Sequence, residues 1–343
     1  MEDLKPAVDI RVSERTDIAE ARRAAVRLAR ELGFEEHAEA KLALVVTEIA
    51  SNLVKHAQSG RVLLSPVKSA GGQRGMDVFG IDKGPGMRDF ARCAQDGYST
   101  AGSPGTGLGA IIRQSEQFDV YTREGSGTVI RARCMATKQA PAEDANFDIG
   151  GVVLALGGHP ESGDAWATRT NHDKLTLLAV DGLGHGHIAQ EAAQAAISVF
   201  LSHPHLAGES MVRQIDLALK STRGAAILLV EIDSVRQRLS SAGVGNIAGA
   251  IYSNSECRHL ISMNGIVGYR MGQVRFFEYD WQPGSVLIVH SDGLRNRWRL
   301  EDYSGLISKS SALIAGVLLR DAARGTDDAS IAIVRSRGVG HAA

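Results

Sequence analysis

The chain has 343 residues, of which 44% are hydrophobic and 22% charged, and its formal net charge is −1. This composition is typical of a globular protein with a sizeable core, and the length is enough for two domains. The balanced charge excludes a general attraction to nucleic acid or to an anionic membrane, so we expect neither as a partner.

The cysteines and the apolar runs show which classes of protein are not expected. Cys93, Cys134 and Cys257 lie far apart with no Cys-x-x-Cys pair, which argues against a disulfide framework and against a thiolate metal site. The N-terminus lacks the basic and apolar regions of a signal peptide. No apolar run approaches the ~20 residues that a transmembrane helix needs. We therefore expect a cytoplasmic protein.

The first part of the chain alternates between helical and strand patterns. Helices are expected from Thr16 to Gly33 and over 36–57, because apolar residues recur there at helical spacing. On the second helix, Glu48 and Asn52 lie one turn apart and project together. A further helix begins at the glycines of 105–109. Strands are expected at 7–12, 61–67, 75–81, 117–123 and 127–134.

Two glycine-rich motifs accompany this helix pair. Asp82-x-Gly84-x-Gly86 follows a strand, and Gly105-Thr106-Gly107-Leu108-Gly109 opens a helix. Each motif has an ordinary structural explanation, as a turn or a hinge, and the Glu48 face could simply be solvated. Glycine also lets the backbone approach a ligand, and free N–H groups at a helix start attract phosphate.

In this order, the three motifs resemble the ATP-binding fold shared by gyrase, heat-shock chaperones, histidine kinases and MutL (GHKL). The resemblance covers about residues 10–135 and is closest to the anti-sigma-factor serine kinases, because no phosphoacceptor histidine domain is evident. It implies a two-layer α/β sandwich that binds ATP and Mg²⁺. Asn52 would hold Mg²⁺, Asp82 would accept a hydrogen bond from adenine, and Glu48 would be the general base. The remaining ATP-binding positions would be Gly84, Gly86, Gly105, Thr106, Gly107, Leu108 and Gly109. Lys55 or His56 could reach a phosphate, unless they are only surface residues.

A small, polar, proline-broken stretch at 138–146 is the expected linker. It separates a first domain, 1–137, from a second, 147–336, with a tail at 337–343. In the second domain we expect helices at 187–201, 209–220 and 309–322. Strands are expected at 147–156, 164–170, 175–180 and 329–335, with short strands between 225 and 290.

Acidic residues recur at the ends of these strands. An apolar run ends at Asp181-Gly182, another ends at Asp292-Gly293, and Asp164 begins a strand pattern. Asp327 and Asp328 precede the last strand. Each could be an ordinary turn. One sheet could instead bring them together around two divalent cations, since hard cations prefer oxygen ligands.

The order Gly-Asp, Asp-Gly-x-Gly-His-Gly, Arg-Gly-Ala, Ser-Asp-Gly and Asp-Asp-Ala-Ser resembles the metal-dependent protein phosphatases of the 2C type. The similarity is to the bacterial branch related to the sporulation phosphatase, and within it to the phosphatase that resets stress-response partner-switching modules. It implies a four-layer α-β-β-α sandwich with two Mn²⁺ or Mg²⁺ ions and water as the nucleophile. The implied metal ligands are Asp181, the Gly182 carbonyl, Asp164, Asp292, and Asp327 in preference to Asp328. Asp181 and Asp292 are the positions on which catalysis would depend.

Some nearby residues have competing interpretations. His185 and His187 are disfavoured as ligands, because hard oxygen sites prefer carboxylates. Arg295, Arg297 and Arg299 could hold a phosphate or an acidic partner, or could form a solvated helix face.

Together, the two resemblances imply an α/β (α+β) protein that acts as a bacterial partner-switching regulator. A phosphoserine/phosphothreonine phosphatase would be joined to an ATP-binding serine-kinase-like domain. The partner would be a small phosphoserine antagonist protein of the anti-anti-sigma (STAS) type or a sigma-factor regulator. The alternative is a phosphatase gated by a non-catalytic domain that binds ATP or a sigma factor.

Overall fold

The computed structural model describes residues 5–57, 59–68, 72–93, 107–137, 146–253 and 256–337. Its contacts divide the chain into two compact units. The N-terminal unit combines Ala7–Ala142 with a later segment, Arg299–Asp321. The C-terminal unit combines Glu143–Trp298 with the residues from Ala322 onward. The expected linker lies almost entirely outside the described residues.

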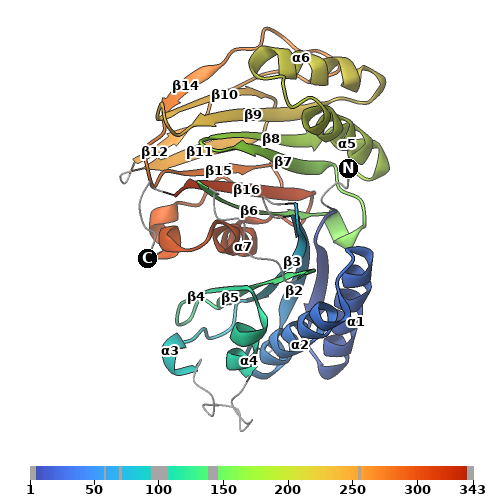
Figure 1. The fold of residues 1–343 in the computed structure, drawn as a ribbon, viewed down its shortest axis with the longest axis vertical. Helices are drawn as coiled ribbons and strands as arrows, with labels where there is room; N and C mark the ends of the chain where they lie inside the picture. The colour runs from blue at the N-terminus through green and yellow to red at the C-terminus, as the bar shows by residue number, and fades with distance from the viewer. Residues whose placement is uncertain are drawn as a thin grey trace. The chain divides into compact units, whose positions relative to one another are not determined.

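The N-terminal unit is built on a five-stranded antiparallel sheet with strand order β1-β2-β3-β5-β4. The helices α1 and α2 lie on one face of this sheet, and its strands match those expected from the sequence (Figure 1). The strands are β1 (Val8–Val12), β2 (Gly60–Lys68), β3 (Arg74–Asp82), β4 (Gln117–Thr122) and β5 (Thr128–Met135).

Within the described residues of Ala7–Ala142, the helices are α1 (Arg15–Glu31), α2 (Glu36–Asn52), α3 (Phe90–Cys93) and α4 (Gly107–Gln114). The helix expected over 36–57 is α-helical only to Asn52 and continues as a π-helical turn, Leu53–Ala57. It packs closely on the sheet at Gly80, where an added Cβ would lie 2.5 Å from Cγ2 of Ile49. Glycine at this position therefore lets α2 approach β3.

The opposite face of the sheet is covered by α7 (Ser311–Ala322). Successive strand residues point to opposite faces, so Phe79 points away from α2 where Gly80 points toward it. A Cβ added to Gly316 of α7 would lie 3.0 Å from the Phe79 ring and 3.3 Å from Val129. The segment also contains the 3₁₀ turns Leu300–Asp302 and Leu306–Ser308. The expected two-layer sandwich thus gains a third layer from a distant part of the sequence, because both faces of β3 carry apolar side chains.

The C-terminal unit contains two sheets. One has the strand order β13-β10-β9-β8-β7, with β14 also paired to β10, and the other has the order β12-β11-β15-β16-β6. The strands are β6 (Phe147–Leu154), β7 (Asp164–Asn171), β8 (Lys174–Gly182), β9 (Ala225–Asp233), β10 (Arg238–Val244), β11 (Ala248–Ser253), β12 (Glu256–His259), β13 (Ser262–Met263), β14 (Phe277–Asp280), β15 (Val286–His290) and β16 (Ala329–Ser336).

Successive side chains of β8 point to opposite faces of its sheet and join two separate apolar clusters. Leu177 joins an apolar cluster with residues of β15 and β16 between the two sheets. Leu178 points the other way, into a cluster with α5 (His187–Ser202) and α6 (Gly208–Ala218). The third helix expected in this domain, at 309–322, is α7, which the contacts group with the N-terminal unit. None of the helices in the described residues is long and apolar enough to cross a membrane.

Candidate functional site

The end of α2 and the start of α4 form the first candidate site. Glu48 and Asn52 are both half-buried at the end of α2. A Cβ added to Gly107, the first residue of α4, would lie 2.8 Å from Oε2 of Glu48 and 3.6 Å from Oδ1 of Asn52. A side chain at position 107 would therefore fill the space in front of both polar groups.

The structure describes only some of the other residues of this glycine motif. Leu108 packs against the core and Gly109 is buried, so both serve the packing of α4. Gly105 and Thr106 lie outside the described residues. Their expected contact with phosphate stays a prediction, as do the roles of Glu48 and Asn52.

Asp82 lies half-buried at the end of β3. Its Oδ1 accepts hydrogen bonds from the backbone N–H groups of Gly84, at 2.7 Å, and Thr128, at 3.2 Å. Burial raises the pKa of Asp82 above its ordinary value, and these two N–H groups act against that rise. The bonds hold the carboxylate in one orientation, which is what recognition of a base edge requires.

Glycine is required around Asp82 for steric reasons. Gly86 has a φ of 69°, and a Cβ there would collide with the carbonyl of Arg123. A Cβ on Gly84 would lie 3.0 Å from Cα of Ala57. Beside this loop is a hollow of about 500 Å³, lined by His56, Ala57, Ser59, Lys83, Gly84 and Pro85. The donors, the amide oxygen of Asn52 and this hollow fit Mg²⁺ and a nucleotide.

The second candidate site lies at one end of the β7–β8 hairpin. Asp164 and Asp181 are direct register partners, so their side chains lie on the same face. Asp164 is only 4% exposed, and its Oδ2 has no hydrogen-bond partner among the described residues. Burial, and then the charge of Asp181, raise the pKa of Asp164 well above its ordinary value. An orphaned, buried carboxylate oxygen beside a second carboxylate is a site that needs a cation.

Further carboxylates surround Asp181. Burial, and then the charges of Asp292, Asp327 and Asp328, raise the pKa of Asp181 to about 7. Asp292 follows β15, and its Oδ2 accepts a hydrogen bond of 2.8 Å from Nδ2 of Asn246. Asp327 is exposed in the turn before β16. The structure thus brings the predicted acidic residues into one electrostatic neighbourhood.

The two adjacent aspartates before β16 differ in what they contact. Asp328 is buried, with Oδ1 accepting from Leu156 N–H at 2.7 Å and Oδ2 from Gly163 N–H at 2.6 Å. Among the described residues, Asp327 Oδ1 accepts the N–H of Asp328, at 2.9 Å, and no other hydrogen bond. Both oxygens of Asp328 are therefore used by the backbone, which favours Asp327 as the metal-binding member of the pair.

Among the residues that the structure describes, the carboxylates of this site do not form a closed metal-binding cluster. No three His, Cys, Asp or Glu side chains in the described part of the chain converge at the spacing of metal ligands. The chemistry of the donors nevertheless fits hard divalent cations, because they are carboxylates, and burial followed by the charge of neighbouring carboxylates raises the pKa values of Asp164 and Asp181. The metal assignment rests on that crowding and on the orphaned oxygen of Asp164.

The loop after Asp181 is shaped by its glycines. A Cβ on Gly182 would collide with the carbonyl of Ala189 in α5, and Gly184 has a φ of 104°. A Cβ on Gly184 would also lie 3.2 Å from Nη1 of Arg223. The guanidinium of this exposed arginine therefore lies over the loop that follows Asp181.

The histidines and the later arginines lie at the surface. His187 is exposed and pairs with Glu161 at 3.4 Å, so it is engaged away from the carboxylates. His185 is also exposed, and its charge lowers the pKa of Asp327, which burial raises. Arg295, Arg297 and Arg299 are exposed but lie in irregular chain, so they do not form a helix face.

Two side chains of this site were not predicted from the sequence to be functional. Arg223 stands in the Arg-Gly-Ala motif, which carried the family resemblance but no role. Asn246 lies in a Gly-Asn turn with no distinguishing signal, and only the fold places it beside Asp292. Both are polar donors next to the acidic cluster.

The fold and the two sites are those of a kinase-like ATPase domain joined to a protein phosphatase domain. Residues 12–134 match the family described as the histidine kinase-like ATPase domain. Residues 171–337 match the family described as stage II sporulation protein E (SpoIIE). The chain belongs to the first family through its N-terminal domain and carries a SpoIIE-type phosphatase domain of the 2C class.

Known proteins similar to each half support this assignment. The serine/threonine-protein kinase RsbT of Bacillus subtilis (strain 168) is 32% identical over 36% of this chain and 92% of its own length. The phosphoserine phosphatase RsbX of the same organism is 25% identical over 38% of this chain and 67% of its own length. The crystal structure of RsbX in complex with magnesium has a TM-score of 0.50 at 21% identity, covering 55% of this chain and 94% of RsbX. The chain therefore combines components of the partner-switching type, a kinase-like domain and a serine/threonine phosphatase domain.

Proposed function

We propose that this protein controls the phosphorylation of a small regulatory protein, with its C-terminal domain removing phosphate from serine. The observation that carries the proposal is the crowding of Asp181 by Asp164, Asp292 and Asp327. Two divalent cations, Mn²⁺ or Mg²⁺, would supply the charge that activates water and stabilises the phosphoryl oxygens. Asp164, Asp181, Asp292, Asp327 and the Gly182 carbonyl would hold them.

The chain's own residues orient this site. Asn246 donates to Asp292 and leaves the other carboxylate oxygen available. Asp328 ties the backbone at Leu156 and Gly163 to the turn before β16, which positions Asp164 and Asp327. Arg223, which lies over the Gly184 loop, would hold a phosphate group of the substrate.

The N-terminal domain would bind ATP with Mg²⁺ and phosphorylate a protein serine. Asp82 would accept the adenine amino group, Asn52 would hold Mg²⁺, and Gly107 would lie under the phosphates. Glu48 would take the proton from the attacking serine hydroxyl. The 2.8 Å approach of Glu48 to the Gly107 position supports this role. The cytoplasmic location expected from the sequence remains a prediction.

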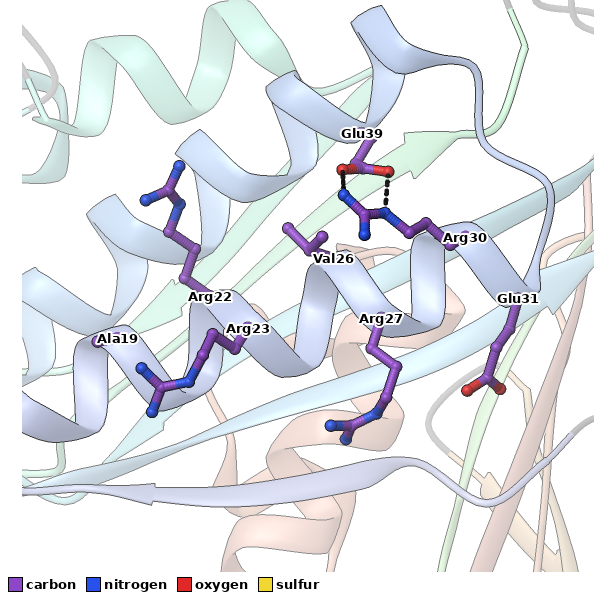
Figure 2. A pocket seen from close by; sticks show the side chains of 8 residues that line it. All are labelled: Ala19, Arg22, Arg23, Val26, Arg27, Arg30, Glu31 and Glu39. Carbon is purple, nitrogen blue, oxygen red and sulfur yellow. Dashed lines mark hydrogen bonds and ion pairs between the residues drawn. The ribbon is translucent and has the colours of Figure 1, made fainter.

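The proposed partner is a small STAS-type antagonist protein. A basic surface on α1 is available for a partner of acidic or phosphorylated character. It surrounds a hollow of about 720 Å³ lined by Ala19, Arg22, Arg23, Val26, Arg27, Arg30, Glu31 and Glu39. Arg30 is paired with Glu39, whereas Arg22, Arg23 and Arg27 extend from the helix without an ion pair among the residues drawn (Figure 2).

The test is transfer of labelled phosphate. Full-length protein, γ-labelled ATP and a purified STAS-domain protein should give a phosphoserine product, and Glu48→Gln should abolish its formation. The phosphoserine form should then lose its label with Mn²⁺ and wild-type protein but not with Asp181→Asn. If wild type binds ATP yet transfers no phosphate, the N-terminal domain is a non-catalytic gate.

A further inference from the structure

The position of the segment Arg299–Asp321 in the sequence assigns it to one domain, whereas its packing assigns it to the other. In the chain it lies inside the SpoIIE match, between Asp292 and Asp327. In the structure its contacts group it with Ala7–Ala142. Figure 1 shows α7, in red, beside the strands of the N-terminal unit. A segment that lies within the phosphatase domain in the sequence is therefore packed in the N-terminal unit.

Helix α7 of this segment is largely apolar and buried, and one side of it packs on the sheet at Gly316. Leu313, Ile314, Val317 and Leu318 of α7 are fully buried. Gly316 sits so close to Phe79 and Val129 that an added Cβ would touch both. A helix with this much buried apolar surface cannot leave its site at low cost, because exposing apolar side chains to water is unfavourable.

Polar contacts fix the register of the segment. Asp119 of β4 accepts hydrogen bonds from the backbone N–H of Ser310, at 2.9 Å, and from Nζ of Lys309, at 3.3 Å. The rings of Tyr121 and Tyr303 lie 6.5 Å apart. Asp119 thus clamps the start of α7 to the sheet.

The strands under the segment end at the nucleotide loop. Phe79 lies three residues before Asp82 on β3. Val129 follows Thr128, whose N–H donates a hydrogen bond to Asp82. Arg320 of α7 is 4% exposed at its side chain, is paired with Asp321, and leaves Nη1 without a partner among the described residues. Its charge lowers the pKa of Asp82, against burial, which raises it.

The two ends of the segment lead to the phosphatase loops. Leu294 and Ala323 form a β-bridge, with Arg295 N–H bonded to the Ala322 carbonyl at 2.9 Å. Asp292 lies two residues before this bridge and Asp327 lies four residues after it. A Cβ on Gly293 would collide with the carbonyl of Asp328, so the two loops are closely packed.

We propose that the segment Arg299–Asp321 couples the two sites, so that nucleotide binding near Asp82 changes the rate at the carboxylates of Asp292 and Asp327. This inference rests on the proposed function of both domains. A shift of β3 or β5 on nucleotide binding moves α7, and α7 moves the bridge from which both metal loops start. Closely packed elements transmit such shifts because they resist continuous deformation. Coupling requires that the nucleotide bind the two arrangements with different affinity.

The experiment measures phosphatase turnover of full-length protein on p-nitrophenyl phosphate with Mn²⁺, with and without a saturating non-hydrolysable ATP analogue. For wild type we expect a change of about fivefold or more. Asp119→Ala removes the clamp without touching either site and should reduce the change to under about twofold while the basal rate is kept. Lys309→Gln, which alters the same contact from the other side, should have a similar effect.

Asp9→Ala is the matched control. Asp9 lies in the same sheet, is 19% exposed at its side chain as Asp119 is, and pairs with Arg61 rather than with the segment. It should keep the full nucleotide effect. The proposal is overturned if both clamp variants also keep the full effect, or if an active wild type binds the analogue by calorimetry without a change in rate. Inactivity with Mn²⁺, or no binding of the analogue, would instead overturn the proposed function and the coupling with it.

Discussion

Asp164 and Asp181 oppose each other as register partners at one end of the β7–β8 hairpin, with Asp164 almost completely buried. Two carboxylates in this position repel each other, and burial strengthens the repulsion because water no longer screens it. The pair is therefore a cost to folding unless a proton or a cation is bound. That relationship leads to the first prediction.

Asp164→Asn should stabilise the protein in EDTA and destabilise it relative to wild type in Mn²⁺. The substitution removes repulsion but also removes a ligand, so the variant loses stabilisation by metal binding. Each kcal/mol of repulsion relieved should raise Tm by about 2–4 °C. Thermal melts with EDTA and with Mn²⁺ measure both effects. Asp280→Asn, at an exposed ion pair, should change little in either condition.

Asp181→Ala and Asp292→Ala should each lower Mn²⁺-dependent phosphatase turnover by at least about a hundredfold, because each removes a carboxylate from the cation site. Hydrolysis of a phosphoserine peptide by full-length protein measures the loss. EDTA should abolish the wild-type rate. Turnover near the wild-type level in either variant would contradict the metal assignment.

Asp82→Asn should weaken ATP binding by roughly 10- to 100-fold, because a hydrogen bond to a charged group contributes about 1.5–3 kcal/mol. Calorimetry on the full chain with Mg²⁺ gives the affinity. Asp89→Asn, at a loop carboxylate that accepts the N–H of Arg92, is the control and should bind ATP as wild type does. Equal affinity for all three proteins would show that adenine is recognised elsewhere.

Arg223→Ala should raise KM for a phosphoserine peptide about tenfold with a smaller effect on kcat, since an arginine over the Gly184 loop would bind phosphate in both ground and transition states. Arg213→Ala is the comparison, because Arg213 is an exposed arginine paired with Glu209 on α6. An unchanged KM for Arg223→Ala would exclude a contact with substrate phosphate.

Asp77→Ala should destabilise the N-terminal unit by about 3–5 kcal/mol, because it leaves Arg131 buried without its partner. Asp77 is 1% exposed and accepts hydrogen bonds from Arg131, at 3.0 Å, and Arg133, at 2.7 and 2.8 Å. Chemical denaturation of the full chain, followed in both units, measures the loss.

The same carboxylate predicts a pH dependence. Burial would raise the pKa of Asp77, but Arg131 and Arg133 outweigh it and hold the pKa below the ordinary 3.8. A depressed folded-state pKa contributes stability that is present above the ordinary value and is lost as pH falls below it. Wild type should therefore lose stability in acid more steeply than Asp77→Asn does.

The sequence predicted individual elements well where their patterns were unambiguous. The helix expected at 187–201 is α5, His187–Ser202, and the strand expected at 175–180 lies within β8, Lys174–Gly182. Local periodicity determines such elements. The acidic motifs were visible for a related reason, because strand-end aspartates followed by glycine are a local feature of the sequence.

Long-range placement was not predictable from the same patterns. The run Ala312–Leu319 is apolar on all sides, which indicates burial but not the partner that covers it. Nothing in the sequence links Gly316 to Phe79, more than two hundred residues earlier. Asn246 likewise carries no signal in its own neighbourhood, because its role depends on where Asp292 lies.

The position of α7 near the end of the sequence affects how the chain folds while it is being synthesised. The ribosome makes the chain from the N-terminus onward. The sheet face that carries Phe79 is therefore synthesised long before α7, the helix that covers it. During that interval the nascent chain exposes an apolar surface that a chaperone would recognise. A fragment ending near residue 140 keeps this surface permanently uncovered and should aggregate, whereas grafting 299–321 onto it by a flexible linker should restore solubility.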